Sequence, residues 1–111
     1  TADVTFVGVG QMGREAPMHK DGFVTRDQMD AMQANGAVGE IVGGVYDAEG
    51  RYIDTPLNGC MGGVRIETGR SLPVIGVAAG EGKLAAIRAA LQGRILNGLV
   101  TDESTAAALL A

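Results

Sequence analysis

Two charged side chains stand close to glycine-rich strand ends, where they could contact a polar ligand. Glu40 interrupts the apolar run GAVGEIVGGV, in which an ionised carboxylate is costly to bury without a partner. Lys83 falls in the first turn of a predicted helix, where the helix dipole disfavours a cation unless a negative group is close. A polar ligand held between Glu40 and Lys83 would account for both positions. The alternative is a surface lysine and a glutamate at a strand end, with no ligand role.

Other polar residues give further signals at the same strand ends. Glu81 begins the predicted helix that carries Lys83, and Thr101–Asp102 follows a predicted strand. For the pair Thr101–Asp102, capping of the last helix is favoured over contact with a ligand. His19 and Lys20 lie in a loop with polar neighbours, and by themselves they indicate no function.

The chain has one cysteine, Cys60, and one histidine, His19, so it lacks the ligand spacing of a zinc site. Cys60 follows Asn58-Gly59 and has no matched base, which favours a small apolar or loop thiol over a nucleophile. We therefore expect neither a structural metal nor covalent catalysis.

The opening sequence VTFVGVGQMG contains a formal match to G-x-G-x-x-G from Gly8 to Gly13. This fingerprint binds dinucleotides when a helix follows at once and an acidic residue ends a second strand roughly 20 positions on. Here Pro17 interrupts any helix after one turn, and the acidic candidates, Asp27 and Asp30, fall in a predicted helix. We therefore expect a buried strand over Val4–Val9 with a sharp turn at its carboxyl end, and no NAD binding.

The segment TRDQMDAMQANGA carries clear helix signals. Thr25 is placed as the N-cap, Gln28 completes a capping box, and Gly36 ends the helix. Met29 and Met32 form a narrow apolar stripe, which is typical of core packing.

An apolar run rich in Val and Ile predicts a single strand from Val38 to Tyr46. The turn Asp47–Gly50 then leads into a short strand at Tyr52 and Ile53. The segment CMGGVRIE predicts a further extended stretch.

The last third of the chain predicts a strand, a helix, a strand and a terminal helix. The segments are LPVIGVAAG, EGKLAAIRAALQGR, ILNGLVTD and ESTAAALLA, with Leu84, Ile87 and Leu91 facing inward from the first helix. A strand, helix and strand of this length form a parallel, right-handed unit. The predicted fold class is therefore α/β, a Rossmann-like and mostly parallel sheet with flanking helices.

Composition limits the classes of function. The chain has 111 residues, 46% hydrophobic and 20% charged, enough for one small domain or a part of a larger one. A net charge of −4 with dispersed basic residues argues against nucleic-acid binding by this chain alone. There is no charged and apolar leader and no apolar run long enough to span a membrane, so we expect a soluble, cytoplasmic protein.

Several segments together resemble the carboxyl-terminal effector-binding domain of the SorC family of bacterial transcriptional regulators. They are GAVGEIVGGVYDAEGR and LPVIGVAAGEGKLAAIRAALQGRILNGLVTDESTAAALL, preceded by a strand that ends in VGVG. The resemblance runs over nearly the whole chain. Its features are the turn Gly36–Gly39 with an acidic residue after it, the turn Asp47–Gly50, Ala79-Gly80 followed by Lys83, and Thr101-Asp102 before the terminal helix.

The resemblance implies a fold similar to glucosamine-6-phosphate deaminase, ribose-5-phosphate isomerase and CoA-transferases. It also implies that residues 1–111 are the second half of a sensor domain that binds a phosphorylated sugar. A phosphate-cradling loop and the DNA-binding helix-turn-helix would belong to sequence that this chain does not contain.

The same resemblance implies roles for individual residues. Glu40 takes the place of an acidic residue that accepts hydrogen bonds from sugar hydroxyls, although relatives often have aspartate there. Lys83 matches a lysine that reaches the effector. Gly80 allows the end of the strand that precedes it to come close to the ligand. Lys20 lies near a basic residue that binds the phosphate, and His19 could serve instead, although PMHKDG departs from the usual pattern.

Two functions of different kinds follow. In the first, the chain senses a phosphorylated sugar and thereby alters oligomerisation and operator binding, without catalysis. In the second, it is a sugar-phosphate isomerase or deaminase-like enzyme in which Glu40 supplies a base and Lys83 an electrophile. A half-domain would expose apolar sheet surface, so we also expect a homo-oligomer or a remnant of a longer molecule.

Overall fold

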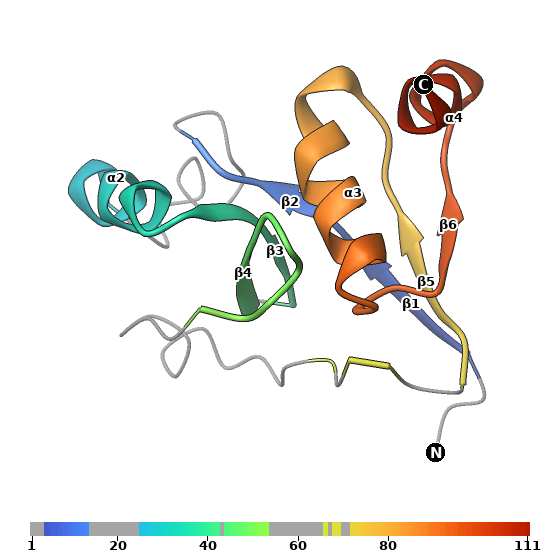
Figure 1. Ribbon diagram of the computed structural model, residues 1–111, viewed down its shortest axis with the longest axis horizontal. Coiled ribbons are helices and arrows are strands. Elements are labelled where there is room, and N and C mark those ends of the chain that lie inside the picture. The colour runs from blue at the N-terminus through green and yellow to red at the C-terminus, as the bar shows by residue number, and fades with distance from the viewer. Residues whose placement is uncertain (1–3, 14–24, 43, 54–65, 67, 70–71) are drawn as a thin grey trace.

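Two small sheets and three helices make up the described part of the chain (Figure 1). The computed structural model describes residues 4–13, 25–42, 44–53, 66, 68–69 and 72–111. No helix within these ranges is both long enough and apolar enough to cross a membrane.

The first sheet is parallel, with the strand order β1-β5-β6. Its strands are β1 (Thr5–Gly8), β5 (Val74–Val77) and β6 (Gly98–Val100). Between β5 and β6 the chain forms a short 3₁₀ turn, η1 (Glu81–Lys83), and the helix α3 (Leu84–Gln92). The expected strand, helix and parallel strand are therefore confirmed, and with them the α/β fold class.

The second sheet is antiparallel and corrects one prediction. It consists of β2 (Gly10–Gln11), β3 (Ala37–Ile41) and β4 (Gly44–Asp47). The predicted single strand from Val38 to Tyr46 is thus a hairpin, in which Ile41 pairs with Gly44. The turn begins at Val42, whose φ of 52° is a conformation that β-branched residues rarely adopt. Because valine is typical of strands, the residue type gave no sign of a turn at this position.

The opening glycines also differ from the prediction. β1 ends at Gly8, and the chain then continues into β2 of the other sheet instead of turning sharply toward a helix (Figure 1). The predicted burial of the whole strand is wrong, because Phe6 is 65% exposed while its neighbour Val7 is buried. One face of the parallel sheet packs on α3, and successive residues of a strand point to opposite faces.

The helix α2 (Arg26–Ala34) confirms its predicted signals. The Thr25 hydroxyl accepts a hydrogen bond from the Gln28 N–H at 3.1 Å, and the Gln28 Oε1 accepts one from the Thr25 N–H at 2.8 Å. Met29 and Met32 are buried against β3 and β4. The helix ends before Gly36, which has a φ of 92°.

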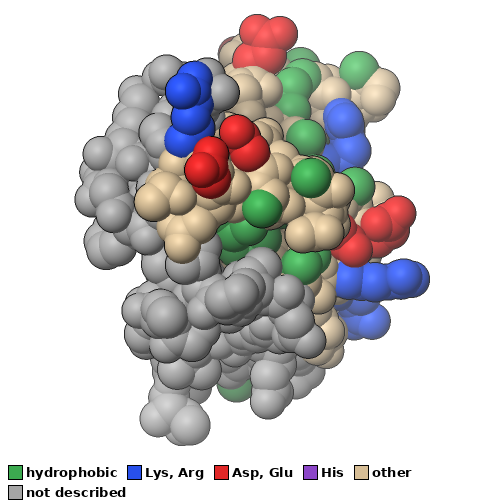
Figure 2. Space-filling view, turned by 90° about the vertical axis from the view of Figure 1, so that its left-hand side faces the viewer, with side chains coloured by type: hydrophobic (Ala, Val, Ile, Leu, Met, Phe, Trp, Pro, Cys, Tyr) green, Lys and Arg blue, Asp and Glu red, His purple; other side chains and the backbone are tan. Residues whose placement is uncertain are grey.

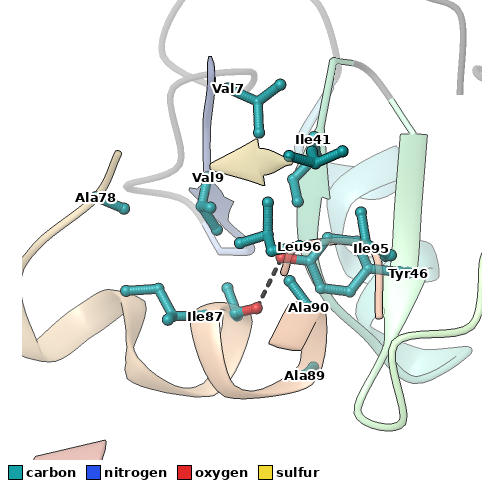
Figure 3. Packing of buried hydrophobic residues seen from close by; sticks show 12 residues of the cluster. Val7, Val9, Ile41, Tyr46, Ala78, Ile87, Ala89, Ala90, Ile95 and Leu96 are labelled. Carbon is teal, nitrogen blue, oxygen red and sulfur yellow. Dashed lines mark hydrogen bonds between the residues drawn. The ribbon is translucent and has the colours of Figure 1, made fainter. Parts of the chain in front are cut away.

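The core lies between α3 and the two sheets (Figure 3). Ile87 is fully buried as predicted, and Leu91 packs at the edge of the core, whereas Leu84 is only half-buried. The rest of the buried helix face is alanine, which lets the helix approach β3 closely. An ideal Cβ on Gly39 would lie only 2.7 Å from the Cβ of Ala86, so the approach depends on glycine at this position.

One smaller prediction was wrong, and another is not tested. Instead of a strand at Tyr52 and Ile53, the chain forms a single antiparallel bridge between Tyr46 and Tyr52. The extended stretch predicted for CMGGVRIE lies outside the described residues, apart from Ile66. The terminal helix α4 (Glu103–Leu110) is present as predicted.

Charged side chains are mixed on the face shown in Figure 2. Acidic and basic groups are interspersed there, with no extended basic patch among the residues that are coloured. This distribution agrees with the dispersed basic residues of the sequence.

Candidate functional site

The carboxyl ends of the three parallel strands form one rim of the molecule. Gly8 pairs with Val77, which in turn pairs with Val100, so the three strands end side by side. The segments that leave these strands are therefore neighbours, and open α/β sheets bind ligands at this edge.

Glu40 reaches the rim from the second sheet. β3 places Glu40 opposite Gly10 of β2, just beyond the end of β1. An ideal Cβ on Gly10 would lie 3.1 Å from the carboxyl carbon of Glu40, so the glutamate side chain occupies the space that glycine leaves free. The carboxylate is half-buried, and its charge adds to burial in raising the pKa of Tyr46 above its ordinary value.

Lys83 ends η1, at the N-terminus of α3. Its N–H donates to the Gly80 carbonyl oxygen at 3.1 Å, which closes the 3₁₀ turn. η1 packs against β2, the strand whose Gly10 lies under Glu40. The structure therefore brings Lys83 and Glu40 to the same rim.

Gly80 forms the entrance to this turn. Its φ of 119° and ψ of 145° lie in a region that side chains with a Cβ avoid. No atom approaches within 4 Å of the place where a Cβ would be, so backbone geometry and not crowding requires glycine here. The backbone beside Lys83 is consequently open to a ligand.

Two buried polar atoms near the rim have no hydrogen-bond partner within the described structure. They are Oε1 of Gln11, on β2, and Oγ1 of Thr101, directly after β6. Leaving such a group unpaired costs about 1–3 kcal/mol, so a water or a ligand hydroxyl would stabilise it. Our sequence reasoning missed Gln11, because a single polar residue in a glycine-rich segment gives no periodic signal.

Asp102 acts as a helix cap. Its Oδ1 accepts a hydrogen bond from the Thr105 N–H at 2.8 Å, at the start of α4. Hydrogen bonds from the side chain and backbone of Thr105 hold the pKa of Asp102 below its ordinary value. The capping interpretation of this residue is thereby confirmed, and Glu81 is exposed at the start of η1.

Three residues considered from the sequence, His19, Lys20 and Cys60, lie outside the described residues. Among the residues that are described, no three His, Cys, Asp or Glu side chains group together in a way that could hold a metal ion.

The arrangement suits a polar, anionic ligand. Lys83 and the N-terminus of α3 provide positive charge, and the open backbone at Gly80 permits close approach. The Glu40 carboxylate can accept hydrogen bonds from hydroxyl groups on the same ligand. A sugar carrying an anionic group has both features.

Comparison with known proteins gives a consistent result. The Sugar-bind family model, which describes a sugar-binding domain, matches residues 1–111. The chain is 40% identical to the transcriptional regulator LsrR of Enterobacter sp. (strain 638), covering 99% of this chain and 35% of that protein. It is 32% identical to the erythritol catabolism regulatory protein EryD of Brucella abortus (strain 2308), covering 98% of this chain and 34% of that protein.

A solved structure is similar over the same length. The full-length sorbitol operon regulator SorC from Klebsiella pneumoniae superimposes with a TM-score of 0.80 and 32% sequence identity. The match covers 100% of this chain and 36% of that one. The chain therefore spans little more than a third of the length of these relatives.

Proposed function

This chain belongs to the Sugar-bind family of sugar-binding domains, and from that premise we propose that it is the effector-sensing part of a bacterial transcriptional regulator. The effector would be a phosphorylated sugar, and residues 1–111 would form the carboxyl-terminal part of its binding domain. The observation that carries the proposal is the rim shared by Glu40, over Gly10, and Lys83, at the start of α3.

Each residue has a distinct part in this proposal. Lys83 attracts the phosphate or another anionic oxygen, and Gly80 allows that oxygen to approach the backbone. Glu40 accepts hydrogen bonds from sugar hydroxyls, and its length compared with aspartate would influence which sugar fits. His19 and Lys20 are proposed as additional phosphate contacts on the sequence resemblance alone.

Binding would act by shifting a population. If the sugar phosphate binds one arrangement of the regulator more tightly than another, it favours that arrangement by the difference in binding free energy. The arrangements would differ in oligomeric state and thus in affinity for operator DNA. DNA contact would come from a region outside this chain, and the regulator would work in the cytoplasm beside the chromosome.

The test is ligand-dependent thermal stabilisation of the whole regulator. The panel contains pentose and hexose phosphates, the same sugars without phosphate, and NAD. We expect one class of sugar phosphate to raise Tm, and we expect Lys83→Met to remove most of this shift, because Met keeps the length of the side chain without its charge. Arg51→Ala, an exposed cation in the turn after β4, is the matched control and should leave the shift intact.

The possible outcomes separate the candidate functions. A shift that Lys83→Met leaves unchanged would remove Lys83 from the site. Turnover of a sugar phosphate by the regulator would favour the isomerase or deaminase-like alternative. A shift with NAD alone would contradict the proposal.

A further inference from the structure

The interior side of α4 carries a polar residue, Thr105, which is only 3% exposed. Its hydroxyl oxygen accepts a hydrogen bond from the Gly80 N–H at 3.0 Å. Both the hydroxyl and the backbone N–H of Thr105 are hydrogen-bonded to Asp102, the cap of the same helix. Thr105 is therefore held by its own helix while it binds the backbone of a separate segment.

Gly80 links this contact to Lys83. Its N–H is held by Thr105, and its carbonyl oxygen accepts the Lys83 N–H at 3.1 Å. The φ of 119° at Gly80 belongs to a conformation that glycine alone adopts easily, and an unconstrained glycine populates many others. Both polar groups of the Gly80 backbone are hydrogen-bonded, and the partner of its N–H is Thr105 of α4. The position of α4 therefore helps to fix the direction in which the chain enters η1.

Leu109 packs α4 against the core, but the space between α4 and η1 is not filled. A hollow of about 180 Å³ separates them, lined by Glu81, Leu84, Ser104, Thr105 and Ala108. A second link joins α4 to α3 further along, where Nη2 of Arg88 donates to the Ala108 carbonyl oxygen at 3.2 Å on an exposed surface. The hydrogen bond of Thr105, in contrast, reaches Gly80, the residue that precedes η1.

We propose that Thr105 is a positioning residue for the effector site: it fixes the backbone of Gly80 and thereby the place of Lys83. This inference rests on the proposed function, in which Lys83 binds the anionic group of the sugar. Through the same hydrogen bond, a ligand that displaces the Gly80 segment would move α4. Helix α4 would accordingly be the first element whose position changes when the ligand binds.

Two substitutions at this position separate a positioning role from a packing role. Thr105→Val keeps the volume of the side chain and removes the acceptor for the Gly80 N–H, together with the hydrogen bond from the hydroxyl to Asp102. Thr105→Ser keeps the hydroxyl and removes one methyl group. Arg88→Ala is the matched control, since it weakens the attachment of α4 without touching Gly80.

Two measurements are made on the whole regulator and on each variant. The first is the affinity for the sugar phosphate that gives the largest Tm shift in the panel above. The second is hydrogen exchange of the Gly80 amide, followed by NMR without ligand. We expect Thr105→Val to weaken binding roughly tenfold and to speed exchange at Gly80, because a hydrogen bond that orders the site is lost. Thr105→Ser should restore both values, and Arg88→Ala should leave both unchanged.

Other results would overturn the inference. If Thr105→Val speeds exchange at Gly80 but binds the sugar phosphate normally, Thr105 does not position the site and the proposed function stands. If Thr105→Ser or Arg88→Ala weakens sugar-phosphate binding as much as Thr105→Val does, the loss of affinity comes from altered packing of α4 and not from the lost hydrogen bond. If the unaltered regulator binds no sugar phosphate, the proposed function fails first, and the positioning role fails with it.

Discussion

The Tyr46 hydroxyl donates a hydrogen bond to the Ala86 carbonyl oxygen at 2.7 Å, in the centre of the core (Figure 3). This contact joins β4 of the antiparallel sheet to α3, which also covers the parallel sheet. Both residues are buried, so the bond helps fix the two sheets relative to one helix.

Removing this hydroxyl should lower stability measurably. Tyr46→Phe keeps the ring and loses a buried hydrogen bond, so we expect the free energy of unfolding to fall by about 1–2 kcal/mol. Urea unfolding near neutral pH measures this change. Tyr52→Phe removes the hydroxyl that donates to the Ile66 carbonyl oxygen in a part-buried position, and it should cost less. An equal or smaller loss in Tyr46→Phe would contradict the central role of the bond.

The same residue should make the protein sensitive to alkaline pH. Burial, reinforced by the charge of Glu40, raises the pKa of Tyr46 above its ordinary value. In the unfolded chain the phenol ionises near pH 10, so folding favours the protonated form and stability falls as pH rises above about 10. Above about pH 10, the free energy of unfolding of Tyr46→Phe should fall less steeply with pH than that of the unaltered chain. Parallel curves for the two proteins would show that Tyr46 ionises as easily in the folded state.

Gly39 should tolerate no side chain. An ideal Cβ there would lie 2.5 Å from Oη of Tyr46 and 2.7 Å from the Cβ of Ala86, so one of these groups must move. We expect Gly39→Ala to destabilise the fold by about 1–3 kcal/mol through overpacking. Gly82→Ala is the control, since its Cβ would have no neighbour within 4 Å, and its effect should stay within about 0.5 kcal/mol. Similar effects at the two positions would contradict the tight approach of α3 to β3.

Acid should weaken the cap of α4. Hydrogen bonds from Thr105 lower the pKa of Asp102, so the folded state favours the carboxylate. Its contribution is complete above the unfolded pKa of about 3.9 and is lost as pH falls through the lower folded value. Asp102→Asn keeps a capping side chain that cannot titrate. Chemical unfolding between about pH 5 and about pH 2.5 should therefore give a shallower loss of stability in Asp102→Asn than in the unaltered chain. Identical slopes would exclude the carboxylate as a source of acid sensitivity.

The uncovered face of the parallel sheet should bind apolar dyes. Phe6, Val77 and Val100 are 65%, 50% and 53% exposed on neighbouring strands, and contiguous apolar surface of this kind promotes association. We expect the chain of residues 1–111 to bind ANS, and Phe6→Ser with Val100→Ser to reduce the fluorescence. Leu110→Ser, which removes an exposed leucine on α4, is the control and should change it little. Sedimentation of the same proteins tests the expected homo-oligomer, which stays a prediction.

The candidate site was only partly accessible from the sequence. The unusual settings of Glu40 and Lys83 singled them out, and the structure places both at one rim. Their roles as ligand contacts, and those of Gly80, Lys20 and His19, stay predictions. The contact between Thr105 and Gly80 could not be foreseen, because the two residues lie 25 positions apart in the chain and no local pattern links them.

Local hydrogen bonds and hydrophobic periodicity were sufficient to predict several elements from the sequence alone. The capping box of Thr25 and Gln28, the cap at Asp102 and the strand, helix and strand of the last third depend on residues close together in the chain. Only the tertiary structure decided that the run after Gly36 folds into a hairpin and that the opening glycines join the second sheet. Those pairings depend on contacts between distant segments, such as Glu40 with Gly10 and Gly39 with Ala86. A local sequence pattern cannot predict such contacts.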